Sequence, residues 1–152
     1  MERGSWYARR PGPAVSTVLI MLAASAMAAP AGVTLSDPWI RYIGPQTPAA
    51  GYFTLTNSGG QPALLDGASS PGCAQLMLHR SVATNGMASM QMVPSVAVPA
   101  HGSLTFGPGG YHLMCMQPAA AMKVGASVPV TLRFHDGTSL TQSFPVRGAK
   151  GQ

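Results

Sequence analysis

Residues 127–146 read SVPVTLRFHDGTSLTQSFPV, and this stretch indicates the fold more clearly than any other part of the chain. Apolar and polar residues alternate on both sides of Asp136-Gly137, which is typical of two strands joined by a tight turn. We therefore predict a hairpin whose strands are Ser127–His135 and Ser139–Val146. This unit places the chain in the all-β class.

The same kind of alternation recurs upstream in short segments that are separated by clusters of Gly, Pro, Asn and Asp. Turn signals occur at Asn57-Ser58-Gly59-Gly60, Asn85-Gly86 and Gly107-Pro108-Gly109-Gly110. Many short strands at this spacing predict a β-sandwich or barrel. Gln117–Val124 is expected to be a helical turn or a loop. The other predicted strands are Val33–Ser36, Trp39–Ile43, Gly51–Asn57, Ala63–Ala68, Ala74–Ser81, Met90–Val93, Ser103–Phe106 and Tyr111–Met116.

The N-terminal segment has the features of an export signal. Its basic start contains Arg9 and Arg10, and the apolar run Ala14–Ala24 that follows is too short to span a bilayer comfortably. Ala26-Met27-Ala28 has the small-x-small form of a cleavage site. We predict a signal peptide over residues 1–28 and one mature β domain over 29–152, with its core at about 35–146. No other stretch is apolar enough to be an integral membrane segment.

Charge and composition exclude several classes of function. The 152-residue chain carries a formal net charge of +5, but it has no Lys/Arg cluster, which argues against nucleic-acid binding. The mature domain keeps only Asp37, Asp66 and Asp136 as acidic residues. Because no carboxylate pair and no Ser/His/Asp order can be recognised, we expect that the protein is not an enzyme.

Four soft side chains at fixed intervals, His79, Met90, His112 and Met114, form the candidate binding site. Thioether sulfur is a soft neutral ligand that favours Cu(I), and imidazole also suits copper. Residues i and i+2 of a strand point the same way, so His112 and Met114 share one face. The turn at Asn85-Gly86 predicts a hairpin return that brings Met90 towards His79. The residues therefore predict a Cu(I) site.

The remaining methionines and histidines are assigned lesser roles. Met92 and Met87 are the candidates for secondary metal ligands. Met77 and Met116 are expected to serve packing, as methionine on a strand usually does. We interpret His101 and His135, which lie in turns, as solvated bystanders. Trp39 and Tyr111 are candidates to flank the site, and core packing is the expected role of Trp39.

The two cysteines, Cys73 and Cys115, belong to a chain that is predicted to enter an oxidising compartment. An even count permits one disulfide, but the sequence does not show whether the geometry allows it. Alternation turns Cys115 away from the proposed ligands, and we interpret it as a small buried hydrophobic residue.

The spacing His-x10-Met-x21-His-x-Met, with Gly109-Gly110-Tyr111 before His112, resembles the periplasmic copper chaperones called PCu(A)C. Asp37-Pro38-Trp39-Ile40-Arg41, the strand Ala50–Asn57, Gly67–Pro71 and Leu132–Phe134 match as well, so the resemblance runs from about Leu35 to Val146. It implies a cupredoxin-like Greek-key β-sandwich or barrel.

The resemblance also implies a function, a location and partners. The family binds Cu(I) through four ligands, which correspond here to His79, Met90, His112 and Met114. It works in the periplasm and passes copper towards the CuA centre of cytochrome c oxidase, in some cases with a Sco-type protein.

Two other classes of protein compete with this interpretation. A secreted β-sandwich accessory domain that binds no metal would make the Met and His residues incidental. A blue-copper electron carrier would need a cysteine thiolate with a histidine a few residues later. After Cys115 the next histidine is His135, so the ligand loop of that second class is missing.

Overall fold

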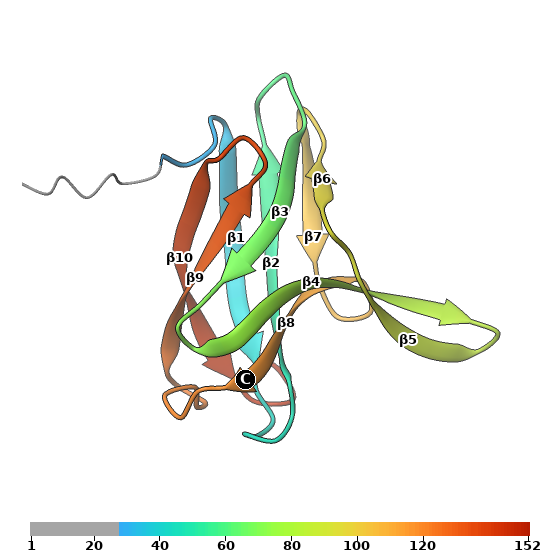
Figure 1. Ribbon diagram of the computed structural model, residues 1–152, viewed down its shortest axis with the longest axis vertical. Coiled ribbons are helices and arrows are strands. Elements are labelled where there is room, and N and C mark those ends of the chain that lie inside the picture. The colour runs from blue at the N-terminus through green and yellow to red at the C-terminus, as the bar shows by residue number, and fades with distance from the viewer. Residues whose placement is uncertain (1–27) are drawn as a thin grey trace, which may run out of the picture.

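The computed structural model describes residues 28–152, which form ten strands. The predicted signal peptide falls almost wholly on residues 1–27, which lie outside the described part. The ten strands are β1 Val33–Arg41, β2 Ala49–Asn57, β3 Ala63–Ser69, β4 Cys73–Thr84, β5 Met87–Met92, β6 Val96–Val98, β7 Gly102–Phe106, β8 Tyr111–Pro118, β9 Ser127–Phe134 and β10 Ser139–Arg147 (Figure 1).

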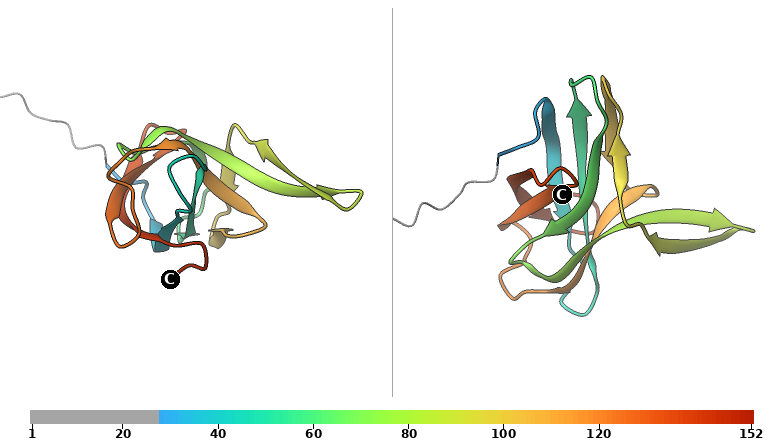
Figure 2. Two further views of the ribbon diagram at one scale, coloured as in Figure 1. Left: turned by 90° about the horizontal axis from the view of Figure 1, so that it is seen from below. Right: turned by 45° about the horizontal axis from the view of Figure 1, so that its top comes forward.

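The strands join in one sheet of order β5-β4-β8-β7-β2-β1-β10-β9-β3-β6, which confirms the all-β class. The parallel pair β1–β10 connects two halves whose other pairs are antiparallel, except for a short parallel contact between β7 and β8. Although β6 lies at the end of this order, it contacts β2 and β7 near its middle, so the sheet folds back on itself around a core. Figure 2 shows this curled body from below and from a tilted view.

The core lies between the two halves of the sheet. Phe53 stacks on Phe106 at a centroid distance of 4.4 Å and meets the edge of Phe144 at 5.7 Å. The hairpin of β9 and β10 contributes Val130, Leu132 and Phe144, which are at most 1% exposed. The alternation that predicted the hairpin therefore describes the side of each strand that faces this core.

Most predicted strands agree with the structure, and the differences have local causes. Two predicted segments form the single strand β1, whose register shifts between Ser36 and Trp39, where Asp37 adopts a φ of 51°. The three-residue strand β6 was not predicted. Part of the segment predicted as a helical turn or loop, up to Pro118, continues β8, and turns follow it. Within residues 28–152 no helix is long and apolar enough to cross a membrane.

A long hairpin of β4 and β5 projects from the body (Figures 1 and 2). The turn Asn85-Gly86 closes it with φ angles of 52° and 78°, the left-handed backbone that a tight two-residue turn requires. Every residue of β5 is exposed. At its base, β4 pairs with β8 from Cys73 to Arg80.

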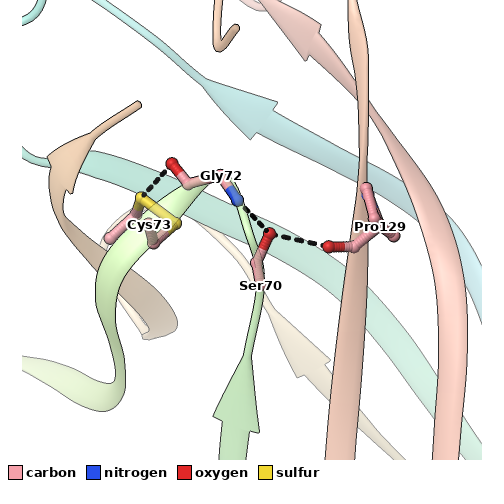
Figure 3. The surroundings of a disulfide bond; sticks show 5 residues. Ser70, Gly72, Cys73 and Pro129 are labelled. Atoms are coloured by element: carbon pink, nitrogen blue, oxygen red, sulfur yellow. Dashed lines mark hydrogen bonds between the residues drawn. A yellow bond between two sulfur atoms is a disulfide. The ribbon is translucent and has the colours of Figure 1, made fainter. Parts of the chain in front are cut away.

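A disulfide between Cys73 and Cys115 connects β4 to β8. Cys115 is buried, as predicted, but its interpretation as a plain hydrophobic residue is wrong because its sulfur is bonded to Cys73. Beside the disulfide, the Ser70 hydroxyl donates to the Pro129 carbonyl at 2.6 Å and accepts from the Gly72 amide at 3.1 Å (Figure 3). These bonds fix the turn that leads into β4.

Removing the disulfide should lower the free energy of unfolding substantially. Cys73 and Cys115 are 42 residues apart, and closing a loop of this length removes about 4 kcal/mol of chain entropy from the unfolded state. We expect the Cys73→Ser/Cys115→Ser variant to lose stability of this order in guanidinium unfolding. Wild-type protein treated with a thiol reductant should match the variant, and the variant itself should not respond to the reductant. Equal stability of oxidised wild type and variant would contradict the prediction.

Candidate metal centre

The two predicted histidine ligands lie opposite each other on neighbouring strands. In the antiparallel pair β4–β8, His79 is the register partner of His112 and Met77 that of Met114. The imidazole rings are 5.9 Å apart between centroids, at an interplanar angle of 28°. Both side chains are buried, His79 at 9% and His112 at 5% exposure. Pairing of β4 with β8 thus brings together two residues that are far apart in the sequence.

A backbone contact fixes the orientation and tautomer of the His112 ring. The Nδ1 atom of His112 lies 3.2 Å from the Gly110 carbonyl oxygen, which can only accept a hydrogen bond. Nδ1 therefore carries the proton in the neutral ring, and Nε2 keeps its lone pair for a metal ion. The same carbonyl also accepts from the Ser81 amide at 3.0 Å, which holds the Gly110 turn against β4.

His79 has an unsatisfied buried atom. Among the described residues, its Nδ1 is the buried side-chain nitrogen or oxygen that has no hydrogen-bond partner. A buried polar atom without a partner is costly, and most native structures avoid it. A metal ion bound beside the ring would satisfy such a nitrogen. The residues present therefore fit a metal that accepts imidazole nitrogen.

The two predicted methionine ligands share a pocket with His112. This pocket has a volume of about 280 Å³, and Met90, His112 and Met114 contribute to its wall from β5 and β8. Met114 is half-buried, whereas Met90 is 60% exposed. Two thioethers and an imidazole from separate strands thus face one cavity, with His79 next to His112.

The register of the β4–β5 hairpin distinguishes Met90 from Met92. Met92 pairs with His79, and Met90 pairs with Ser81, two residues nearer the tip of the hairpin. Only Met90 of these two lines the pocket of His112 and Met114, whereas Met92 lines a separate depression beside Met77 and Val93. Both positions remain within reach of His79 across the strand pair. The pocket favours Met90 as the ligand and leaves Met92 as the secondary candidate.

The other predicted residues lie further from this centre. Met87 is 75% exposed at the start of β5. His101 is exposed, and the exposed His135 lies 3.4 Å from the Asp66 carboxylate through its Nδ1. Within residues 28–152 no three His, Cys, Asp or Glu side chains gather as a metal site. A metal centre among the described residues therefore needs the thioethers.

The aromatic residues play different parts from those expected. Trp39 is half-buried outside the core, which corrects the prediction of core packing, and its ring lies 4.8 Å from that of Tyr52. Tyr111 packs on Phe106 at 5.7 Å and carries the guanidinium of Arg80 at 5.5 Å over its ring. Neither Trp39 nor Tyr111 belongs to the pocket wall.

Sequence reasoning missed the residues that form the far wall of the pocket. Arg41 and Tyr52 line it, and the Arg41 guanidinium lies 5.6 Å from the centroid of the Tyr52 ring. Ala50 lies between Arg41 and Met114, because it pairs with Arg41 on β1 and with Met114 on β8. No local pattern marks these residues, because only the pairing of three strands places them beside the ligands.

Both cysteines of the chain are consumed by the disulfide. The structure therefore offers no thiolate to a metal, and a blue-copper electron-transfer site, which requires one, is excluded.

The fold and its relatives define the class of protein, a β-domain of the PCuAC type. The sequence matches the family model described as "Putative lipoprotein LpqE-like" over residues 33–146, and the chain belongs to this family. It is 36% identical over 121 residues to "Putative lipoprotein Lxx21020" of Leifsonia xyli subsp. xyli, across 79% of this chain and 72% of that protein.

Solved structures agree with this assignment. The copper-bound PCuAC domain from PmoF2 matches with a TM-score of 0.66 at 22% identity, over 80% of this chain and 97% of that domain. The Cu(I) form of DR1885 from Deinococcus radiodurans matches with a TM-score of 0.63 at 36% identity, over 82% and 83% of the two chains. The predicted PCu(A)C resemblance and its β-fold are thus confirmed.

The pKa of His112 should be below its ordinary value in the metal-free protein. Burial lowers this pKa from 6.5, and the charges of His79 and Arg41 lower it further, against the opposing effect of the Gly110 bond. The unfolded state then binds more protons than the folded state just below pH 6.5, so the metal-free fold should lose stability as the pH falls through this window. An NMR titration of the His112 ring against the denatured protein measures the shift. A value at or above that of the denatured protein would contradict it.

Proposed function

We propose that this protein is a Cu(I)-binding metallochaperone whose ligands are His79, Met90, His112 and Met114. The observation that carries the proposal is the side-by-side placement of two histidines next to a pocket lined by two thioethers. The Nδ1 of His79 has no hydrogen-bond partner, and the bond of the His112 Nδ1 to Gly110 leaves Nε2 for a metal. This donor set prefers Cu(I) over Cu(II), which favours tetragonal nitrogen and oxygen ligands. The copper named in the descriptions of PmoF2 and DR1885 supports the same choice of metal.

This site suits the transport of copper rather than the catalysis of a reaction. All four proposed ligands are neutral, so the bound centre keeps the single positive charge of Cu(I). Burying that charge deeply would be costly, and the exposed Met90 keeps the centre near water. Copper can then leave by stepwise exchange to thiolates, which are stronger donors. The acidic residues Asp37, Asp66 and Asp136 do not line the pocket, so the described chain places no carboxylate there for acid–base chemistry.

We further propose where the protein acts and what receives its copper. The N-terminal signal and the disulfide suit export to the periplasm, an oxidising compartment. The family description as lipoproteins supports export. The proposed destination is the CuA centre of cytochrome c oxidase, reached directly or through a Sco-type protein. The alternative of a metal-free accessory domain has no observation in its favour, because it leaves the His79 nitrogen unexplained.

The His112→Ala/Met114→Ala variant should lose stoichiometric Cu(I) binding while keeping the fold. The double change removes two ligands from one strand face and leaves Leu113 and Cys115 in the core. Competition with a coloured Cu(I) chelator, under nitrogen with ascorbate, measures the affinity. Met116→Ala is the matched control, because Met116 is a half-buried methionine of the same strand that does not line the pocket. Parent-like copper binding by the double variant would refute the ligand assignment.

Single substitutions should separate the two neighbouring methionines of β5. We expect Met90→Ala to weaken Cu(I) binding by at least about tenfold, since even an outer partner of a metal ligand can be worth that much. Met92→Ala, with a similar exposure of 67% against 60%, should change the affinity little. The same competition with a Cu(I) chelator measures the Cu(I) affinity of both variants. A larger loss in Met92→Ala would make Met92 the ligand instead.

A further inference from the structure

The pocket beside the proposed copper ligands is larger than a bare ion needs and contains one charged residue. Of the residues that line its volume of about 280 Å³, Arg41 alone carries a permanent charge. Alanine and proline side chains, with Ile43, make most of the opposite wall apolar. Such a cavity, with an apolar lining and one charged group that fixes orientation, has the build of a small-ligand site.

Arg41 is held in place and faces the same side as Met114. The row Arg41–Ala50–Met114 crosses three adjacent strands, so the side chains of its two ends point to the same face with only a methyl group between them. The Tyr52 ring, which is 3% exposed, supports the guanidinium at 5.6 Å. Arg41 and His112 line the same pocket, so the guanidinium belongs to the wall of the proposed metal site.

No carboxylate of the described chain neutralises Arg41. Within residues 28–152 the ion pairs are those of Asp66 with Arg133 and His135. Asp136 accepts bonds from Thr138, and Asp37 lines a different depression beside Trp39. A loaded site would therefore hold two positive charges in one pocket, Cu(I) and Arg41, with no anion beside them.

We propose that this pocket receives the incoming ligand of the copper acceptor, an anionic thiolate whose carboxylate is bound by Arg41. This inference rests on the proposed function and deepens it by naming the chemistry of the acceptor. The thiol releases its proton to solvent, its sulfur forms a bond to Cu(I), and one protein thioether–copper bond breaks. No electron moves, and copper remains Cu(I). The thiolate and the carboxylate together balance the two positive charges. A thiol whose second group is an uncharged hydroxyl or a cationic ammonium cannot do so.

The test measures the exchange of Cu(I) from the loaded protein to three small thiols, 3-mercaptopropionate, 2-mercaptoethanol and cysteamine. Rates are compared by stopped flow at equal thiolate concentration and low ionic strength, with the disulfide checked by mass spectrometry afterwards. We expect Arg41→Gln to slow exchange with 3-mercaptopropionate about three- to tenfold, as the loss of one charge near the ligand implies. Exchange with 2-mercaptoethanol, whose thiolate has no carboxylate, should slow by a smaller factor, and Arg41→Lys should restore part of the loss.

Arg147→Gln is the matched control for charge. Arg147 is the register neighbour of Arg41 on β10 and stacks on Trp39 at 5.5 Å, but it does not line the pocket. The Arg147→Gln variant should leave unchanged the ratio of the exchange rate with 3-mercaptopropionate to the exchange rate with 2-mercaptoethanol. If Arg41→Gln and Arg147→Gln slow Cu(I) exchange with all three thiols by the same factor, the effect comes from the overall charge of the protein and the proposed subsite is wrong.

Two further experiments complete the test. The first distinguishes a free thiol from a protein segment as the source of the ligand, and the second distinguishes failure of the subsite from failure of the proposed function. An acidic cysteine peptide, Gly-Glu-Cys-Gly, replaces the small thiol: dependence on Arg41 with this probe assigns the pocket to a protein segment, and dependence with 3-mercaptopropionate alone assigns it to a free thiol. In the metal-free protein, 3-(methylthio)propionate should shift the amide signals of Ala50 and Met114 in wild type but not in Arg41→Gln. Failure of copper binding would refute the proposed function, whereas absence of these shifts would refute the subsite.

Discussion

The pairing of β4 with β8 is the constraint on which the rest of the candidate site depends. Its register sets His79 against His112 and Met77 against Met114. The Gly110 carbonyl accepts from the Ser81 amide across this junction, and the same oxygen lies beside the His112 ring two residues further on. A slip by one residue would turn every side chain of one strand to the other face, so that His112 would enter the core in place of Leu113. Site geometry and core packing are therefore fixed by the same set of backbone bonds.

The disulfide reinforces this register covalently. Cys115 lies directly after Met114, and its bond to Cys73 ties β8 to the start of β4 on the core side. Beyond Arg80, β4 leaves the body and pairs only with β5. The histidines thus lie where the rigid body ends and the projecting hairpin begins. This arrangement gives the site two preorganised nitrogens and one thioether on an exposed arm.

The site combines buried donors with an open approach. His79 and His112 are buried, and burial lowers the pKa of His112, which favours its neutral, metal-binding ring, while Met90 remains exposed to solvent. A site with four buried donors would retain its metal, and one with four exposed donors would not orient it. Arg41 adds a fixed positive charge to the pocket wall, and in the proposed transfer this charge favours an anionic acceptor.

Local alternation in the sequence was enough to predict the β class, nine of the strand regions and the shared face of His112 and Met114, because a period of two is a property of the strand itself. The sequence also named the soft residues, since their chemistry does not depend on the fold. The spacing also favoured Met90 over Met92. The sequence could not join Cys73 to Cys115 or place Arg41 beside Met114. These are relations between strands, and they depend on register and on pairing across long stretches of chain, which only the tertiary structure determines.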